Sequence, residues 1–497
     1  MRSRWHCAIL LPMILTIGAA GCSDGSDKLI EQANLDDVLR VLIQAHQLTG
    51  DPAAGRDLPD VSDPLAQLGM QLFFTKSLGG QMDSACVTCH HPLLGGGDDL
   101  SLPIGVDAVV PDLLGPGRLH SSSGFAYDGG PTVPRNAPTT FNIGLWDQVM
   151  FHDGRVESLG KTAGMNGDDG EGIRTPDTEF GVADENALNL AQSQARFPVT
   201  SPEEMRALFK EAEDNEAVRD ALAGRLVDQE IPNTWLREFQ QAFDSNASAD
   251  ELITYMNISL AIGEYERSQI FVDSPWRAYV QGHDKAIGDA AKRGAILFYT
   301  SREEGGAQCV ACHSGDFFTD ENFHVLSMPQ IGRGKGDGEF GDDDFGRWRE
   351  TGVEADRYAF RTPSLLNATA TGPWTHAGAY LSLAAVVRHH ADPERAIDSY
   401  DFSLLELDPG MQGEHAQENT RSALSQLQSL RNAGESKLPP PYVQSDDDVA
   451  DLIAFMDSLT DPCVEDRDCL GQWIPDSSDS GPDNLQLNGV DENGAPL

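Results

Sequence analysis

The sequence has few cysteines, few basic residues and, beyond its first 22 residues, no long apolar run. Among 497 residues there are eight cysteines, and 35 Lys and Arg stand against 79 Asp and Glu, for a net charge of −44. Such acidity argues against a nucleic-acid partner and favours solubility, a basic partner or a salt-adapted host. No later segment approaches the roughly 18 apolar residues of a membrane-spanning helix. No stretch alternates convincingly like a strand, so the predicted fold is mainly α.

The first residues have the pattern of an export signal. Arg2 and Arg4 precede an apolar run from Ala8 to Ala20, which is too short to span a membrane with these flanks. The small residues before Cys22 resemble a bacterial lipoprotein box, in which the cysteine is acylated and becomes the first residue. We therefore predict a lipid anchor on Cys22 and a location in the periplasm or cell envelope. The alternative is an ordinary cleaved signal with an incidental cysteine.

Four cysteines form two copies of one motif. Cys86-Val87-Thr88-Cys89-His90 and Cys309-Val310-Ala311-Cys312-His313 both read C-x-x-C-H, the attachment signal of c-type haem. The two thiols add to the porphyrin vinyl groups, and the adjacent imidazole becomes an axial ligand of the iron. A redox dithiol or half a zinc site is the alternative, but neither copy has a second Cys/His pair at zinc-site spacing. The motifs predict two covalent haems per chain.

A matching arrangement precedes each motif. Residues 63–74 and 290–298 carry apolar residues at helical spacing, and each stretch leads through a loop into C-x-x-C-H. This internal repeat predicts two cytochrome c-like units. Residues 249–282 are also predicted to be helical. Long loops rich in Gly, Asp and Pro over 94–134 and 332–346 are expected to be functional or to wrap a cofactor.

These patterns divide the chain into five parts. The last part carries Cys463 and Cys469, which we expect to form a disulfide after export. It is acidic and rich in Gly, Pro and Ser, so we expect it to be flexible. The parts are a signal peptide (1–21), a tether with a helix (22–61), an N-terminal cytochrome c-like domain (62–283), a C-terminal one with a closing helix over 449–459 (284–462) and the acidic tail (463–497).

Five further stretches carry a family resemblance: Arg135–Asn142, Phe151–Arg155, Glu204-Met205, Phe360–Leu365 and Thr371–Gly378. With the two haem motifs they resemble, in order and over about residues 62–462, the bacterial dihaem cytochrome c peroxidase superfamily, which includes the MauG-type enzymes. The resemblance implies that the N-terminal haem reacts with hydrogen peroxide. It implies that the C-terminal haem receives electrons from a small cytochrome c or cupredoxin.

The same resemblance implies a calcium ion between the haems. Its protein ligands would be the side chain of Asn136 and the carbonyl groups of Thr371 and Pro373. Oxygen ligands suit a hard cation. The alternative for Asn136 is an asparagine that caps a turn.

The second iron departs from the family pattern. Family peroxidases place a methionine, and MauG-type proteins a tyrosine, fourteen residues after the histidine that corresponds to His376. That position is His390 in this chain. Ligation by His313 and His390 would lower the potential relative to methionine, because imidazole donates more strongly to ferric iron. His389 is the alternative ligand, and ligation by neither residue is the third possibility.

The first iron is predicted to be open. Many family members carry a distal histidine where this sequence reads Ile104-Gly105-Val106-Asp107, and valine cannot ligate iron. His120, in an inserted loop, is the substitute to consider. His91 directly follows the proximal ligand and is badly placed to reach the opposite face. We therefore expect a high-spin first haem that can bind peroxide.

Peroxide chemistry needs an acid/base group over the open iron. By resemblance this is Glu204, whose pKa an apolar haem pocket would raise. The alignment leaves Glu203 open, and Ser201–Glu204 also reads as a helix capping box. The family's nearby glutamine corresponds to Thr162, a weaker hydrogen-bonding partner.

The family's tryptophan between the haems corresponds to His152, which is much harder to oxidise. Trp146 or Trp374 is a possible substitute in electron relay. The leading hypothesis is a dihaem peroxidase, attached to the membrane by lipid only, and the resemblance also implies a homodimer. The alternatives are a MauG-like oxidase of aromatic residues on a partner protein and a non-enzymatic dihaem electron carrier.

Overall fold

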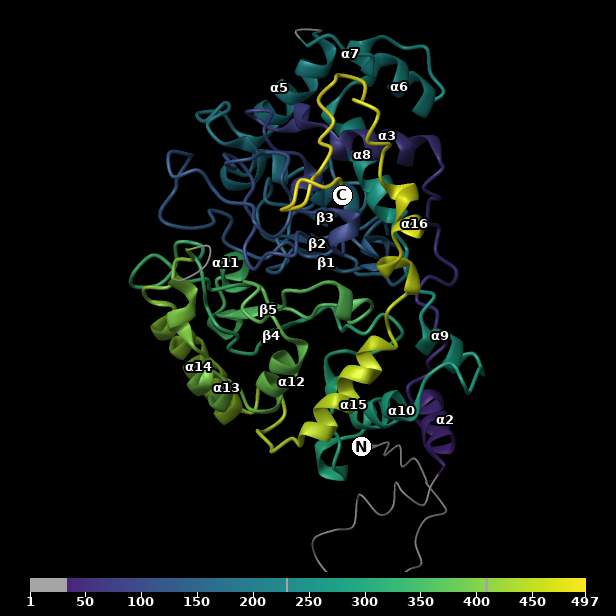
Figure 1. The fold of residues 1–497 in the computed structure, drawn as a ribbon, viewed down its shortest axis with the longest axis vertical. Coiled ribbons are helices and arrows are strands. Elements are labelled where there is room, and N and C mark those ends of the chain that lie inside the picture. Colours follow the sequence, from purple (N-terminus) through teal and green to yellow (C-terminus); the bar gives the residue numbers. More distant parts are fainter. Residues whose placement is uncertain (1–33, 229–230, 407–409) are drawn as a thin grey trace, which may run out of the picture.

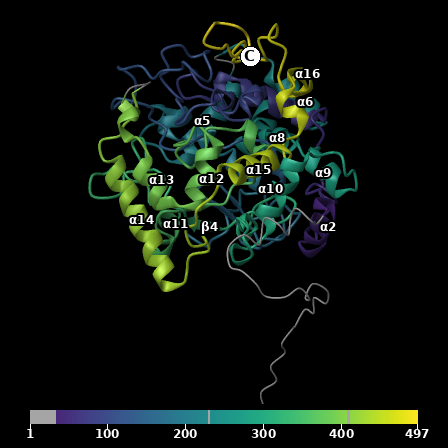
Figure 2. The ribbon, with the colours of Figure 1, turned by 60° about the horizontal axis from the view of Figure 1, so that its bottom comes forward.

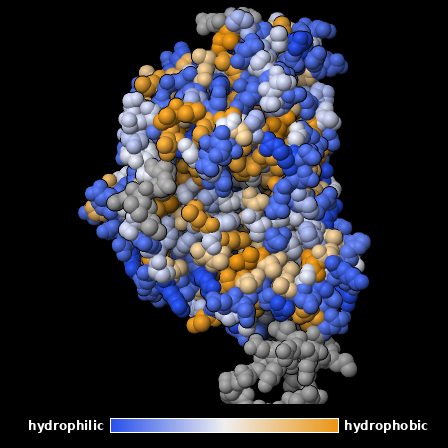
Figure 3. Space-filling model, viewed as in Figure 1, coloured by the Kyte–Doolittle hydropathy of each residue, from blue (hydrophilic) through white to orange (hydrophobic). Residues whose placement is uncertain are grey.

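The computed structural model describes residues 34–228, 231–406 and 410–497. The predicted signal, Cys22 and the first part of the predicted tether lie outside the described residues. Helices joined by long irregular loops dominate this part of the chain, as Figure 1 shows, and the predicted mainly α fold is confirmed. Within these ranges, no helix is both long and apolar enough to cross a membrane. The face seen in Figure 3 is largely hydrophilic, with scattered apolar patches.

Two helical units lie one above the other along the long axis of the molecule (Figure 1). Figure 2 shows α12, α13 and α14 grouped on one side of the C-terminal unit. The helices of the N-terminal unit are α3 (Pro64–Phe74), α4 (Leu190–Gln194), α5 (Asn215–Val227), α6 (Trp235–Ala242), α7 (Ala249–Leu252) and α8 (Tyr255–Arg267). The others are α2 (Leu35–Ala45), α9 (Pro275–Val280), α10 (Asp289–Tyr299), α11 (Trp348–Thr351), α12 (Leu383–Ala391), α13 (Pro393–Ser399), α14 (Ala416–Ala433), α15 (Asp446–Asp457) and α16 (Arg467–Leu470).

The predicted repeat is visible in the structure, because the same pair of crossing helices occurs once in each unit. Each unit packs the helix before its C-x-x-C-H motif against a later helix, α3 against α8 and α10 against α15. A Cβ at Gly69 would lie 1.9 Å from the carbonyl oxygen of Ala261, and a Cβ at Gly294 would lie 1.9 Å from that of Asp451. Only glycine allows two helix backbones to approach so closely. The same glycine contact therefore fixes both crossings.

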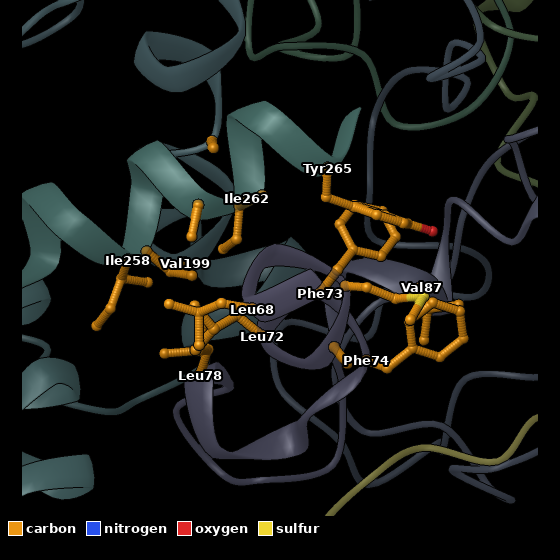
Figure 4. Packing of buried hydrophobic residues seen from close by; sticks show 14 of the residues in the cluster. Leu68, Leu72, Phe73, Phe74, Leu78, Val87, Val199, Ile258, Ile262 and Tyr265 are labelled. Atoms are coloured by element: carbon orange, nitrogen blue, oxygen red, sulfur yellow. The ribbon is translucent and has the colours of Figure 1, made fainter. Parts of the chain in front are cut away.

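Two apolar cores stabilise the two units. In the N-terminal core, Leu72 and Phe73 of α3 meet Ile258 and Tyr265 of α8, as Figure 4 shows. In the C-terminal core, Phe455 of α15 lies among the aromatic rings of α9 and α10. Full burial of one large aliphatic or aromatic side chain stabilises the folded state by about 1.5–3 kcal/mol through the hydrophobic effect.

The strands are few and short. β1 (Val149–Met150), β2 (Val156–Ser158) and β3 (Ile173–Arg174) form an antiparallel sheet. β4 (Phe323–Val325) and β5 (Ala359–Arg361) form a second antiparallel pair. No run of two or three residues shows a detectable alternation, which explains why the sequence indicated no strand.

The domain limits differ from the prediction at the second boundary. Residues up to 283 were assigned to the N-terminal domain, but Val272, Trp276 and Tyr279 belong to the C-terminal core. The ring of Trp276 contacts Phe455 edge to face at 4.9 Å. The predicted helix near the start, α2, also packs there, because Leu39 is fully buried in the same core.

The acidic segment predicted to be a flexible tail packs against the rest of the molecule. Residues 463–497 are described throughout, and they pack on the N-terminal unit rather than the C-terminal one. The predicted disulfide joins Cys463 to Cys469. Trp473 and Leu487 are buried in the N-terminal core. The acidic composition concealed these few apolar residues, whose burial offsets the cost of ordering the segment.

One buried carboxylate attaches this tail. Asp483 accepts hydrogen bonds from the Thr75 hydroxyl at 2.9 Å, the Ser77 hydroxyl at 2.7 Å and the Trp235 indole nitrogen at 2.8 Å. We expect Asp483→Ala to lower the free energy of unfolding by about 2–4 kcal/mol, because three buried donors lose their acceptor. Denaturant unfolding measures the change. Asp479→Ala, on the exposed part of the tail, is the matched control, and equal effects of both variants would contradict this packing.

Candidate functional site

The first C-x-x-C-H motif begins as a short 3₁₀ turn, Cys86–Thr88. Nδ1 of His90 lies 3.1 Å from the carbonyl oxygen of Gly96. A carbonyl only accepts, so Nδ1 carries the proton and Nε2 is left with the lone pair that a metal needs. The Arg135–Asn142 stretch holds this loop in place, since Thr140 donates its backbone N–H to the same carbonyl at 3.0 Å.

The second motif repeats this geometry. Its turn is Cys309–Ala311, and Nδ1 of His313 lies 3.1 Å from the carbonyl oxygens of both Phe318 and Pro363. Burial, with a smaller effect of His390, lowers the pKa of His313 to about 4. The imidazole is therefore neutral, with Nε2 available. Both histidines thus have the orientation and protonation that an axial haem ligand requires.

Three of the motif thiols, Cys86, Cys89 and Cys309, do not resemble those of a redox dithiol. Burial raises the pKa of Cys309 to about 12 and raises the pKa values of Cys86 and Cys89. A reactive dithiol needs a lowered pKa, so that the thiolate is present at neutral pH. The chemistry of these residues instead fits attachment to haem, with each thiol pair beside an available imidazole.

A large cavity extends from the second motif towards the N-terminal unit. It is rimmed by the second motif and by several of the stretches that carry the family resemblance. The residues that line it include Cys309, Cys312, His313, His390, Asn136, Pro138, Trp146, His152, Phe360, Thr371, Pro373, Trp374 and His376. The Arg135–Asn142 stretch therefore contacts the first motif on one side and lines this cavity on the other.

The two adjacent histidines of α12 have different surroundings. His390 lines the cavity with His313, and its Nδ1 lies 2.9 Å from the carbonyl oxygen of Val386. Nε2 of His390 is thus available. His389 is fully buried, with Nδ1 2.9 Å from the Tyr380 hydroxyl and Nε2 2.9 Å from the carbonyl oxygen of Leu326. Both nitrogens of His389 already have partners, which favours His390 as the second ligand.

Glu204 lies beside the first motif. The loop around Gly105 packs on its segment, because a Cβ at Gly105 would lie 2.2 Å from the carbonyl oxygen of Glu204. Val106 donates its N–H to the carbonyl of Glu203 at 3.4 Å and is itself fully buried. The capping-box alternative is not formed, since Ser201 makes no side-chain cap to this turn.

The charge of Glu204 is balanced between burial and nearby cations. Burial raises its pKa, Arg155 and Lys335 lower it, and Glu203 raises it again. Glu204 in turn raises the pKa values of Cys86 and Cys89, after the larger effect of burial. A carboxyl with a raised pKa beside the first motif is a chemically suitable acid/base group.

The two alternative first-site histidines differ in their surroundings. His120 stacks on Tyr127 at 5.6 Å, with Nδ1 2.9 Å from the carbonyl oxygen of Ser121, and its buried Nε2 has no hydrogen-bond partner among the described residues, so His120 stays the substitute to test. His91 is buried, and its Nδ1 accepts the backbone N–H of Leu93 at 3.2 Å. The described residues nearest the Glu204 turn thus offer the side chain of Val106 where the family carries a distal histidine.

Thr162 does not belong to the site, contrary to the prediction. Its side chain is exposed, and its backbone N–H donates to Asp169 at 3.1 Å in a surface loop. The insertion between Thr162 and Glu204 changes the path of the chain, so the position in the alignment does not correspond to a position in space.

His152 lies in the wall of the large cavity. Its Nε2 is 3.1 Å from the carbonyl oxygen of Asn136, and burial, with Arg135 and Arg361, lowers its pKa to about 3. The imidazole is therefore neutral. Trp146 and Trp374 line the same cavity, so both tryptophans remain candidates for electron relay.

The three predicted calcium ligands face one cavity. Asn136, Thr371 and Pro373 all line it. The amide nitrogen of Asn136 donates to the carbonyl oxygens of Leu100 at 3.0 Å and Ser101 at 3.2 Å. The side-chain oxygen of Asn136 is thereby left for a cation, and the oxygen donors present fit calcium.

Two basic residues near the first motif were missed. Arg118 is buried and donates to the carbonyl oxygens of Ile104 at 2.7 Å and Gly105 at 2.9 Å, so it holds the loop that contacts Glu204. Lys335 approaches Glu204 from the 332–346 loop. The composition of both loops indicated a functional role, but no sequence motif singles out either residue.

Comparison with known proteins agrees with this geometry. Residues 63–285 match the family described as di-haem cytochrome c peroxidase. The MauG methylamine utilization protein of Methylorubrum extorquens is 28% identical over 340 residues, covering 68% of this chain and 71% of that protein. The cytochrome c551 peroxidase of Pseudomonas aeruginosa is 25% identical over 338 residues, covering 67% and 71%.

Solved structures support the fold. A MauG-like protein associated with microbial copper homeostasis superposes with a TM-score of 0.52 at 21% identity, covering 83% of this chain and 93% of that one. The diheme peroxidase BthA of Burkholderia thailandensis gives 0.51 at 19%, covering 88% and 92%. Fold and motifs together define a di-haem oxidoreductase of the peroxidase class. Residues 63–285 thus carry the di-haem cytochrome c peroxidase family pattern, and about two thirds of the chain is similar to both MauG and cytochrome c peroxidase proteins.

Proposed function

We propose that the protein is a periplasm-facing di-haem peroxidase. It converts hydrogen peroxide, two protons and two electrons from a small cytochrome c or cupredoxin into two waters. One observation carries the proposal, namely the asymmetry of the two sites. His313 and His390 line one cavity, whereas the turn beside the first motif brings Val106 and Glu204 together. An enzyme of this type needs one closed iron for electron transfer and one open iron for substrate.

The bound haems would supply the redox chemistry, held by Cys86, Cys89 and His90 in one unit and by Cys309, Cys312 and His313 in the other. Glu204 performs the proton transfer that peroxide cleavage requires. Its carboxylate accepts the proton of the near oxygen and returns it to the far oxygen, which leaves as water. Val106 offers no ligand atom beside the first motif. His390, with His313, would hold the second iron.

Electrons have to cross the stretch between the two sites. Trp146 and Trp374 line the large cavity and are the oxidisable side chains for electron transfer between the two sites. His152 fits a positioning role, because its neutral ring holds the carbonyl of Asn136. Calcium at Asn136, Thr371 and Pro373 would stiffen the same stretch. A lipid on Cys22 would retain the enzyme at the membrane surface, where a small donor diffuses, and a homodimer is compatible with this arrangement.

The similarity to MauG proteins supports a second candidate function, the oxidation of aromatic side chains on a partner protein. His152 argues against a close copy of that system, because it replaces the oxidisable tryptophan that such a reaction uses for relay. His390 in place of tyrosine is a second departure.

We expect two covalent haems per chain, because both motifs have the same geometry. The pyridine haemochrome of the purified protein measures them, and the haem stain should survive a denaturing gel. The double variant Cys86→Ala/Cys89→Ala should retain one haem, and so should Cys309→Ala/Cys312→Ala. A single haem in the unmodified protein would refute this architecture.

A further inference from the structure

An open cleft of about 700 Å³ lies between the two units beside Glu203. The N-terminal unit contributes Asp128, Thr132 and Glu203 to its wall, and the C-terminal unit contributes Arg333 and Lys335. Glu203 directly precedes Glu204, so the cleft connects solvent to the turn that carries the proposed acid/base group.

The loop that carries Lys335 is firmly held. Lys335 donates its backbone N–H to the carbonyl of Asp343 at 2.8 Å, and its own carbonyl accepts a hydrogen bond from Arg349 at 2.9 Å. The same loop is anchored to the N-terminal unit, since Arg135 donates to Asp344 at 2.6 and 2.7 Å. These contacts fix where the side chain of Lys335 begins.

The ammonium of Lys335 differs from the other cations of the cleft. Arg333 pairs with Asp128 at 3.3 Å, and Arg349 pairs with Asp337 at 2.5 Å. Among the described residues no ion pair or hydrogen bond of the Lys335 ammonium is found. Burial, with Arg155 and Arg135, lowers the pKa of Lys335, and Asp344 and Asp153 act in the opposite direction. The charge of Lys335 in turn lowers the pKa of Glu204.

We propose that this cleft is the path by which hydrogen peroxide reaches the first haem, and that Lys335 is a positioning residue that keeps Glu204 ready to accept a proton. The inference rests on the proposed function. A carboxylate must be ionised to take the first proton from peroxide, and burial alone works against ionisation. A cation held across the cleft stabilises the ionised form, and Arg155 contributes in the same direction.

Charge at position 335 can be changed chemically. In the haem-loaded protein the motif cysteines would form thioethers and Cys463 is bonded to Cys469, so Lys335→Cys adds a thiol on the wall of the open cleft. Aminoethyl methanethiosulfonate restores a positive charge there, and the sulfonatoethyl reagent adds a negative one. Arg333→Cys, treated in the same way, is the matched control in the same cleft.

Two readouts follow from the charge. The first readout is the rate constant of the ferric protein with peroxide, measured from pH 5 to 8. The apparent pKa below which this rate falls, called the acid limb, should be about half a unit to one unit higher in Lys335→Cys. At a pH below this pKa the variant should therefore react about threefold to tenfold more slowly. Aminoethylation should reverse this shift, and the sulfonate should increase it. The second readout is the azide dissociation constant of the ferric protein, which should rise as the charge at position 335 changes from positive to neutral to negative.

Equal acid limbs and azide affinities for both labels at position 335 would overturn the proposal. Labels at position 333 that act as strongly would also overturn it, because the effect would then be general to the cleft. If the protein does not react with peroxide but its azide affinity depends on the charge at position 335, the peroxidase function is refuted. Lys335 would then still lie on the ligand-binding side of the first haem.

Discussion

Replacing Glu204 by glutamine should slow the reaction of the ferric protein with peroxide by about 10²–10⁴-fold, the contribution of a lost acid/base group. Glutamine keeps the size of the side chain and its place beside the first motif, but it cannot accept the proton of the near oxygen. Stopped-flow mixing with peroxide measures the rate. The equilibrium affinity for cyanide should stay nearly unchanged, because it reports the open iron.

Glu203→Gln is the matched control for this prediction. Glu203 is the neighbouring carboxyl on the same turn, and it lines the cleft. It should retain most of the peroxide rate. Equal rates in Glu204→Gln and the unmodified protein would remove Glu204 from the mechanism, and a large loss only in Glu203→Gln would transfer the role by one residue.

His390→Met should raise the reduction potential of the second haem by a substantial part of the roughly 0.8 V range that axial ligands span. A thioether donates more weakly to ferric iron than imidazole does. His390→Ala should convert the second iron to high spin, because it leaves His313 as the one protein ligand. Spectroelectrochemical titration measures the potential, and the optical spectrum reports the spin state.

His389→Gln separates ligation from packing. It breaks the contacts with Tyr380 and Leu326 inside the unit, so it should lower the stability by about 1–3 kcal/mol and leave the potential of the second haem unchanged. A changed spectrum in His389→Gln with an unchanged one in both His390 variants would exchange the roles of the two histidines.

Local sequence signals predicted the parts of this molecule that short-range chemistry determines. The helices before both motifs were predicted because apolar periodicity marks them, and α3 spans Pro64–Phe74. His390 was singled out by counting along a stretch without insertions. Its place in the same cavity as His313 depends on α12 packing against the rest of the C-terminal unit, which counting alone does not describe.

Long-range packing determined what the sequence did not reveal. The tail after Asp461 is acidic on average, but Leu487 and Asp483 find partners more than 200 residues away in the N-terminal unit. Thr162 was placed by alignment across an insertion, and the insertion moves it to the surface. Lys335 acts across the two units, so its relation to Glu204 exists only after folding.

The electron paramagnetic resonance spectrum of the fully oxidised protein tests the central claim most directly, because it counts open irons and identifies the ligands of closed ones. The asymmetry between Val106 at one site and His390 at the other predicts one high-spin ferric signal and one low-spin signal of bis-histidine type. His390→Ala should convert the low-spin signal and leave the high-spin one in place. Two low-spin signals without a high-spin component would show that both irons are closed and would contradict the account.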